Sequence, residues 1–260
     1  MIKVSVAIIT FNEERDIERC LQSVQGLADE IVVVDSFSTD KTEEICRYYG
    51  VRFIKHAFEG YVEQKNYAVS QCSNDWVLSL DADEALSPTL KHSIEIIKQN
   101  PNADGYVCNR ATHFCGQHIR HCGWYPDPSL RFWNRTKGKW AGNNPHDKYY
   151  MNEGSICKHI DGDLLHFSYY SIEQHVEQIN KFTSLSAQSK FERGKKSGIL
   201  MILFAPLIRF VRMYILQRGF LDGFDGFIVC KISAQAVFLK YIKLYSLNKI
   251  TNRTNGNINN

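Results

Sequence analysis

The stretch VLSLDADEAL, residues 77–86, runs from apolar residues directly into Asp81, Asp83 and Glu84. The apolar residues 76–80 are typical of a buried strand. If the chain stays extended beyond them, Asp81 and Asp83 project to the same side and face one small volume. Two carboxylates about 4 Å apart repel each other by on the order of 4 kcal/mol at an effective dielectric near ~20. The stretch therefore predicts a divalent cation, and Mg²⁺ shared with substrate phosphates would suit it.

Strands and helices alternate through the first hundred residues. Apolar runs predict strands at 4–10, 30–34, 51–54 and 76–80, and helical spacing predicts helices at 13–24, 42–49 and 62–72. This order is typical of an α/β fold in which helices cover both faces of a parallel sheet. Ligands of such sheets bind beyond the carboxyl ends of the strands.

Polar side chains follow three of these predicted strands. They are Thr10, Asn12 and Glu14 after the first, Asp35 after the second, and Asp81 with Asp83 after the fourth. Each alone is more often a turn residue or a helix cap. Because the strand ends share one edge of the sheet, a common ligand site is the better hypothesis.

The composition indicates an ordinary globular protein of one or two domains. Of 260 residues, 44% are hydrophobic and 23% are charged, and the net charge of +3 is too small to indicate nucleic-acid binding. No small-residue cleavage site precedes Glu13 and Glu14, so we expect no signal peptide. The eight cysteines include no CxxC pair and are expected to be reduced thiols of a cytoplasmic protein.

Four motifs in order resemble the family 2 glycosyltransferases of the GT-A fold. They are VSVAIITFNEE (4–14), IVVVDSFSTDKT (31–42), GYVEQKNYAV (60–69) and LSLDADEAL (78–86), the last carrying a DxD motif. Three later segments resemble the lipopolysaccharide core β-1,4-glucosyltransferase branch, which extends heptose. They are LRFWNRTKGKW (130–140), NPHDKY (144–149) and GDLLHFSYYSIEQHVEQINKF (162–182).

The resemblance implies a GT-A fold, a Rossmann-like sandwich, with a nucleotide-sugar site at the strand ends. The resemblance implies that Thr10, Asn12 and Glu14 line the nucleotide pocket and that Asp35 accepts a hydrogen bond from uracil or ribose. It places Lys65 near the base or diphosphate and Asp81 at the ribose. Asp83 would bind the metal ion, Mg²⁺ or Mn²⁺. His166 is a further candidate metal ligand, although a lone histidine after an apolar pair is more often a core residue.

The catalytic base is expected at His146-Asp147, where members of this branch have His-Glu. We favour Asp147, since proton transfer from the acceptor hydroxyl needs a carboxylate within hydrogen-bond reach. His146 stays open as a rival base or an acceptor-binding residue. In a structural alternative, Asp147 only caps a turn after Pro145.

An alternating stretch, LRFWNR, predicts a strand with Arg131, Trp133 and Arg135 on one face. Such a face suits a phosphorylated sugar acceptor, with Trp133 or Trp140 stacking on a sugar ring and arginine binding phosphate. An ordinary solvated strand face is an equal alternative.

A zinc site is a weaker hypothesis for a cluster of six residues. Their spacing lacks a CxxC knuckle and a second matching pair, so reduced cysteines in an acceptor loop are the better interpretation. The six are Cys108, His113, Cys115, His118, His121 and Cys122.

The C-terminal third has a different composition. A helix at 171–191 is expected to pack on the sheet through a stripe from Ile172 to Phe182. The ten apolar residues ILMILFAPLI (199–208) are too few for a membrane span, so an amphipathic or re-entrant segment at the membrane interface and a buried core helix are the alternatives. Residues 220–245 predict a second surface helix, and about the last fifteen residues predict a disordered tail.

We therefore expect three segments. These are a nucleotide-sugar-binding half at 1–105, an acceptor-binding and catalytic half at 106–192, and an amphipathic helical region at 193–260. The resemblance implies a metal-dependent, inverting hexosyltransferase that moves glucose from UDP-glucose to a heptose-like sugar of the lipopolysaccharide core. It would act in the cytoplasm, peripherally on the inner face of the cytoplasmic membrane. The alternatives are transfer to another lipid-linked glycan or a nucleotide-sugar-binding protein without activity.

Overall fold

The computed structural model describes residues 1–143 and 146–257, without the side chains at 143, 146 and 251–257. Its contacts divide the chain into two units, one of residues 1–111 and 127–167, and the other of residues 112–126 and 168–260. This division differs from the three consecutive segments that we expected. The chain leaves the first unit at residue 111, returns to it at 127 and leaves it again after 167.

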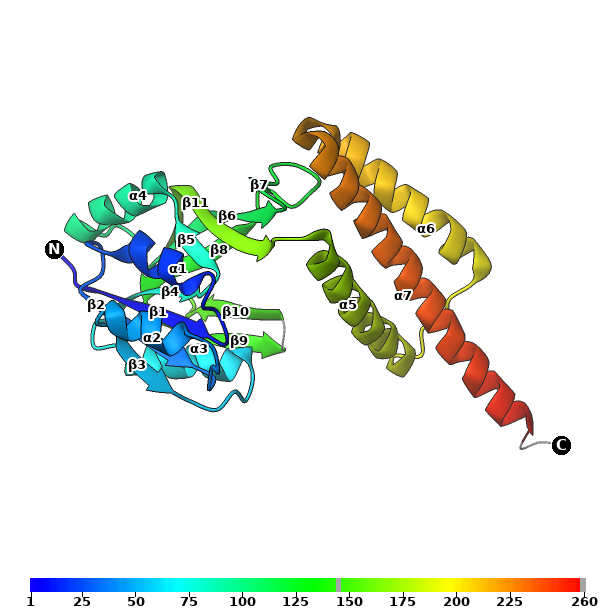
Figure 1. Cartoon of the computed structure of the whole chain (residues 1–260), viewed down its shortest axis with the longest axis horizontal. Helices are drawn as coiled ribbons and strands as arrows, with labels where there is room; N and C mark the ends of the chain where they lie inside the picture. The colour runs from blue at the N-terminus through cyan, green and yellow to red at the C-terminus, as the bar shows by residue number, and fades with distance from the viewer. Residues whose placement is uncertain (144–145, 258–260) are drawn as a thin grey trace. The chain divides into compact units, whose positions relative to one another are not determined.

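The first unit contains a mixed sheet of order β3-β2-β1-β4-β8-β6-β11-β5 (Figure 1). Its parallel part comprises β1 (Val4–Thr10), β2 (Glu30–Asp35), β3 (Arg52–Lys55) and β4 (Trp76–Asp81). These four strands confirm the predicted parallel sheet. The remaining strands are β5 (Glu84–Leu86), β6 (Gly105–Phe114), β8 (Pro128–Asn134) and β11 (Cys157–Tyr169).

Antiparallel pairing distinguishes this second half of the sheet, since β8 pairs antiparallel with both β4 and β6, and β11 with β5. A short helix η1 (Arg135–Lys137) then leads into a separate hairpin of β9 (Gly138–Asn143) and β10 (His146–Met151). This hairpin carries the predicted base.

Helices cover both faces of the sheet, as the alternation predicted. The helices of this unit are α1 (Ile17–Val24), α2 (Thr42–Tyr48), α3 (Tyr61–Gln71) and α4 (Pro88–Gln99). Val6 and Ile8 of β1 pack with Leu21 of α1 and Ile94 of α4, whereas Ala7 between them packs with Ala68 of α3 on the opposite face. The period of two along β1 therefore separates the two cores.

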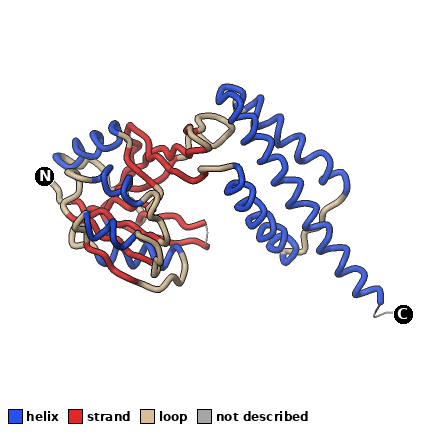
Figure 2. The backbone as a smooth tube through the Cα atoms, viewed as in Figure 1, coloured by secondary structure: helices blue, strands red, loops and turns tan. Residues whose placement is uncertain are grey.

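The second unit is mainly helical (Figure 2). It contains β7 (Gln117–His118), α5 (Ile172–Glu192), α6 (Ile199–Val211) with the π-turn η2 (Arg212–Leu216), η3 (Gly219–Asp222) and α7 (Gly223–Asn257). The loop 112–126 joins these helices through Cys122, which is buried against Met213 and Cys230. Asp222 fixes the same loop by accepting hydrogen bonds from the backbone amides of Arg120 and His121.

Two expectations for the C-terminal region were wrong, and one of two alternatives for α6 is contradicted. Helix α5 belongs to the second unit and packs against α7, and most of its predicted stripe is exposed, including Ile172, Val176 and Phe182. No residue of α6 is buried, which contradicts a core helix. Helix α7 runs to Asn257, where a disordered tail was expected from about residue 246.

Candidate functional site

The carboxyl ends of β1 and β4 open into a cavity of about 570 Å³, hereafter the first cavity. The predicted residues Thr10, Asp81, Asp83 and His166 all line it. His166 arrives from β11, at the position that pairs with Glu84 of β5. The buried Oγ1 of Thr10 has no hydrogen-bond partner in the described part of the chain, so it is available to a ligand.

Three other predicted donor residues stabilise the loop that follows β2 and are not among the residues that line the cavity. Asp35 is fully buried and accepts hydrogen bonds from the amide and hydroxyl of Ser38. Asn12 accepts from the amide of Thr39, and Glu14 accepts from that of Lys41. These contacts are those of turn residues, which was the alternative to a ligand-binding role for each of the three.

Asp81 and Asp83 do not lie in one extended strand, because the chain turns at residues 82–83 between β4 and β5. Asp83 therefore points to His166, whose Nε2 lies 3.1 Å from its Oδ2. Burial alone would lower the pKa of His166, but the hydrogen bond and charge of Asp83 raise it above its ordinary value. A carboxylate and an imidazole at the cavity wall are chemically suited to a divalent cation that takes its other ligands from phosphate and water.

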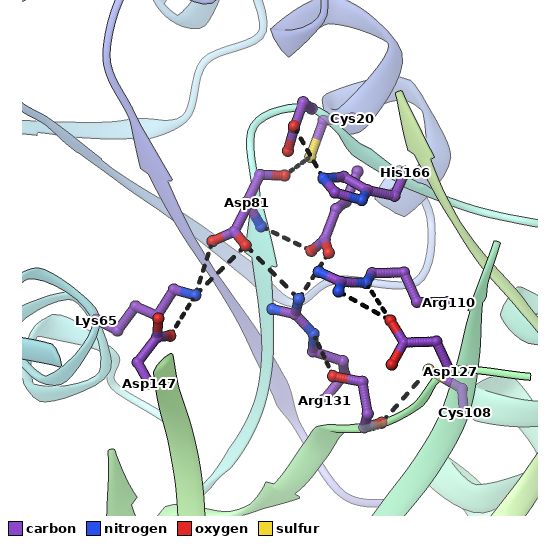
Figure 3. Close-up of polar contacts among 12 residues, drawn as sticks. Cys20, Lys65, Asp81, Cys108, Arg110, Asp127, Arg131, Asp147 and His166 are labelled. Carbon is purple, nitrogen blue, oxygen red and sulfur yellow. Dashed lines mark hydrogen bonds and ion pairs between the residues drawn. The ribbon is translucent and has the colours of Figure 1, made fainter. Parts of the chain in front are cut away.

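Asp81 instead faces two cations (Figure 3). Its carboxylate lies 3.1 Å from Lys65 Nζ and 3.6 Å from Arg131 Nη2. Burial alone would raise the pKa of Asp81, but these two positive charges hold it well below its usual range. The repulsion that we expected between Asp81 and Asp83 is thus offset by separate partners.

Glu84, to which the sequence assigned no role, connects these groups. It is almost fully buried, accepts a hydrogen bond from the backbone amide of Asp81 at 2.9 Å and pairs with Arg131 at 2.6 Å. Burial alone would lower the pKa of Arg131, but Glu84 and Asp81 raise it. The guanidinium therefore stays charged beneath the site.

A second cavity of about 670 Å³ adjoins the first, and Tyr61 and Asp81 line both. The predicted base Asp147 lines this second cavity, and its Oδ2 lies 2.8 Å from Lys65 Nζ. Figure 3 shows Lys65 between Asp81 and Asp147. The side chain of His146, the rival base, lies outside the described residues.

The predicted acceptor face is only partly present. Arg131 lines the second cavity, and its Nη1 has no hydrogen-bond partner in the described part of the chain. The prediction that Trp133 stacks on an acceptor sugar is wrong, because this side chain is fully buried against Trp140 and Tyr149. Arg135 is turned away and donates to the carbonyl of Cys72 at the end of α3.

Sequence reasoning missed several residues of the first cavity. One of them is Glu13, which lines the cavity. Burial, together with repulsion from Asp83 and Asp16, raises the pKa of Glu13 to about 8. Its position in the strand-end motif FNEE could have indicated it. Phe11, Ser36, Tyr61 and Gln64 also line the cavity and lie within three of the four motifs quoted above, whereas Phe58 lies outside them.

The six candidate zinc ligands do not form one site. Cys108 lies in the core of the first unit, whereas Cys122 is buried in the second beside Cys230. His121 is bound to Asp222 at 2.8 Å. Among the described residues, no group of three or more His, Cys, Asp or Glu side chains has the geometry to hold a metal.

The comparisons with known proteins identify the family. Residues 5–157, more than half of the chain, match the family described as Glycosyl transferase family 2. The chain belongs to glycosyltransferase family 2. It is 35% identical to an uncharacterized glycosyltransferase of Rickettsia typhi, covering 95% of this chain and 88% of that one.

A second relative carries a more specific name. The chain is 30% identical over 265 residues to the lipopolysaccharide core biosynthesis glycosyltransferase LpsC of Rhizobium meliloti, covering 98% of this chain and 96% of that one. The structure of mannosyltransferase PcManGT from Pyrobaculum calidifontis, in complex with GDP-Man and Mn²⁺, matches 94% of this chain and 87% of its own with a TM-score of 0.55 at 14% identity. The fold is thus GT-A-like with a C-terminal helical extension, as expected.

Proposed function

We propose that this glycosyltransferase is an inverting, metal-dependent enzyme that moves a hexose, glucose from UDP-glucose, to a sugar of the lipopolysaccharide core. The observation that carries the proposal is the meeting of two cavities at Asp81. One is lined by the Asp83–His166 pair, which is suited to a divalent cation, and the other by the carboxylate of Asp147, which is suited to act as base. The relationship to LpsC supports a core sugar as acceptor.

The donor is assigned to the first cavity. Thr10 Oγ1 would bind the nucleotide, and Asp83 with His166 would hold Mg²⁺ or Mn²⁺ beside the diphosphate. The cation, when bound, neutralises negative charge on the diphosphate leaving group. Lys65 supplies a second positive charge next to Asp81. Because the two cavities meet at Asp81, we place the sugar end of the donor there, in place of the ribose that we first expected. Asn12, Glu14 and Asp35 act indirectly in this proposal, by holding the loop after β2.

Asp147 is assigned as the general base, in the second cavity. The acceptor hydroxyl gives its proton to a carboxylate oxygen of Asp147 while its oxygen forms a bond to the anomeric carbon. The bond from that carbon to the diphosphate oxygen breaks, and the nucleoside diphosphate leaves with the electron pair. Attack from the face opposite the leaving group inverts the anomeric centre. Arg131 Nη1, buried and without a partner among the described residues, would bind an oxygen of the acceptor.

Replacing Asp147 tests the catalytic half of this proposal. Asp147→Asn should bind UDP-glucose with Mn²⁺ as wild type does but lower turnover by about 10²–10⁴-fold. Asp127→Asn is a matched control, because Asp127 lines the same cavity but pairs with Arg110 at its half-exposed rim. His146→Gln decides between the two candidate bases.

An equal turnover of Asp147→Asn and wild type would contradict the assignment of the base. Donor binding without turnover in every variant and with every core acceptor offered would favour the non-catalytic alternative. Turnover with a different lipid-linked glycan would support the transferase activity and contradict the proposed lipopolysaccharide core acceptor.

The proposed location is the cytoplasmic face of the cytoplasmic membrane, where the enzyme would be peripheral. A lipid-linked acceptor requires the active site to work close to a lipid surface. The stretch Ile199–Leu216 is 18 residues long and apolar enough to cross a membrane, because η2 extends the ten apolar residues that we judged too short.

A further inference from the structure

The outward face of α6 is apolar along its whole length. The most exposed side chains of α6 are Leu200 at 73%, Ile208 at 67% and Ile199 at 66%, and only 6% of the stretch from Ile199 to Leu216 is buried. An outer helix face in water normally carries polar residues. An apolar face of this extent indicates a lipid or protein partner.

The turn between α6 and α7 continues this apolar surface. Five large side chains from η2, η3 and the first turn of α7 are exposed by between 48% and 75%: Ile215, Leu216, Phe220, Leu221 and Phe224. We call α6 and these five residues the apolar hairpin surface. It presents leucine, isoleucine and phenylalanine, the residues that interfacial helices bury in the acyl region.

Most of the charges around the apolar hairpin surface are positive, and the acid beside Phe224 in the first turn of α7 is Asp225. Between residues 193 and 221 the sequence contains no Asp or Glu, and its cations are Arg193, Lys195, Lys196, Arg209, Arg212 and Arg218. The next acid, Asp222, is nearly buried and bound to His121. Cations beside an apolar surface complement anionic lipid headgroups, and each contributes about 1 kcal/mol to binding near such a surface.

Helix α7 limits the orientation that α6 can take in a bilayer. The two helices pack along each other, as Figures 1 and 2 show, and α7 carries Lys231, Lys240 and Lys243. Lys243 is bound by Asn180 and Thr183 of the polar helix α5. If α6 crossed the membrane, these lysines would be drawn toward the hydrocarbon, which is costly for charged groups.

We propose that the apolar hairpin surface is a monotopic anchor that lies in the plane of an anionic leaflet, with α7 above it and the cations among the headgroups. This inference deepens the proposed function and rests on its membrane location. The occupant is a lipid surface, because the surface combines apolar exposure with an excess of positive charge, six cations against Asp222 and Asp225. It also replaces the membrane-spanning alternative with an in-plane orientation.

Vesicle flotation of the full chain tests the partner. Wild type should float with vesicles of phosphatidylcholine and phosphatidylglycerol and bind pure phosphatidylcholine much less. Leu200→Glu/Ile208→Glu should lower binding to the anionic vesicles at least tenfold, and Lys195→Gln/Lys196→Gln should lower it by about 30-fold. The matched control is Ile96→Glu, at a 56% exposed position on α4 of the first unit, which should bind as wild type does.

Absence of wild-type binding, or undiminished binding of the Leu200→Glu/Ile208→Glu variant, would overturn the anchor. Calorimetry with UDP-glucose and Mn²⁺ on the same variant separates the two proposals. Retained donor binding with lost flotation supports the anchor, and loss of flotation says nothing against the transferase site.

Cysteine labelling tests the orientation. In a Cys157→Ser background, which removes the exposed native thiol, Lys195→Cys and Arg218→Cys replace cations placed among the headgroups on either side of α6 and η2. An in-plane anchor predicts that an impermeant maleimide labels both headgroup positions only in inverted membrane vesicles from expressing cells. Labelling of one position in inverted vesicles and of the other in right-side-out vesicles would establish a span and overturn the proposal.

Discussion

Lys65 Nζ lies 2.8 Å from Asp147 Oδ2 and 3.1 Å from Asp81 Oδ1, so one ammonium group joins strand β4 to the β9–β10 hairpin. The lysine is 5% exposed, and Trp140 covers it with the ring centroid 4.6 Å from Nζ. The hairpin that carries the proposed base is therefore held to the sheet by a charge that also faces the proposed donor site.

Replacing this lysine should cost stability. Among the described residues, Lys65→Met leaves Asp147 without its ion-pair partner and leaves Asp81 paired with Arg131 at 3.6 Å, so we expect the free energy of unfolding to fall by about 3 kcal/mol. Lys65→Arg retains the charge and should recover more than half of that loss. Urea unfolding of both variants measures the difference, and a methionine variant as stable as wild type would show that the bridge contributes nothing.

Trp133 should behave as a core residue. Its ring stacks on Tyr149 at a centroid distance of 3.9 Å and is fully buried, so Trp133→Ala should lower the free energy of unfolding by about 3–5 kcal/mol. Trp133→Phe keeps an aromatic ring in place and should lose less. Thermal unfolding checks both. If Trp133→Ala lowered turnover with no change in melting temperature, the result would contradict a core role and support the predicted stacking of Trp133 on the acceptor.

His175 should make the fold sensitive to acid. It is 3% exposed among the rings of Phe114, Trp124 and Tyr169, and burial lowers its pKa from 6.5 to about 4. Because only the unfolded chain takes up a proton between these values, its contribution is present above pH 6.5 and lost as the pH falls toward 4. We expect a loss on the order of 2 kcal/mol.

The control for this pH dependence is His175→Phe, which cannot take up a proton. The difference in free energy of unfolding between wild type and His175→Phe should shift by that amount between pH 7.5 and pH 4, measured by urea unfolding. A constant difference across this range would rule out His175 as the titrating group.

Local pattern predicted the first half of the fold well. The apolar runs around Val6, Val33 and Leu78 are long and bounded by turn residues, so their strand character and parallel order could be read directly. The strand ends also predicted that Thr10, Asp81 and Asp83 line one cavity.

Contacts between distant segments could not be predicted in this way. The Lys65–Asp147 pair joins positions 82 residues apart, and no periodicity encodes it. Alternation in LRFWNR correctly indicated a strand. A period of two does not show which face of a strand is solvated, and here a helix and a hairpin cover the face that carries Trp133. The C-terminal helices were predicted, but their union with the loop 112–126 was not, because that loop joins helices that begin more than forty residues later.

The central claim is a metal-dependent nucleotide-sugar site built on Asp83 and His166. Calorimetric titration of UDP-glucose into the full chain, with and without Mn²⁺, tests it most directly beside the Asp83→Asn variant. We predict binding that needs Mn²⁺ and is at least tenfold weaker in Asp83→Asn, with unchanged stability of the variant. Equal binding to wild type and Asp83→Asn, or binding indifferent to Mn²⁺, would contradict the proposed metal site.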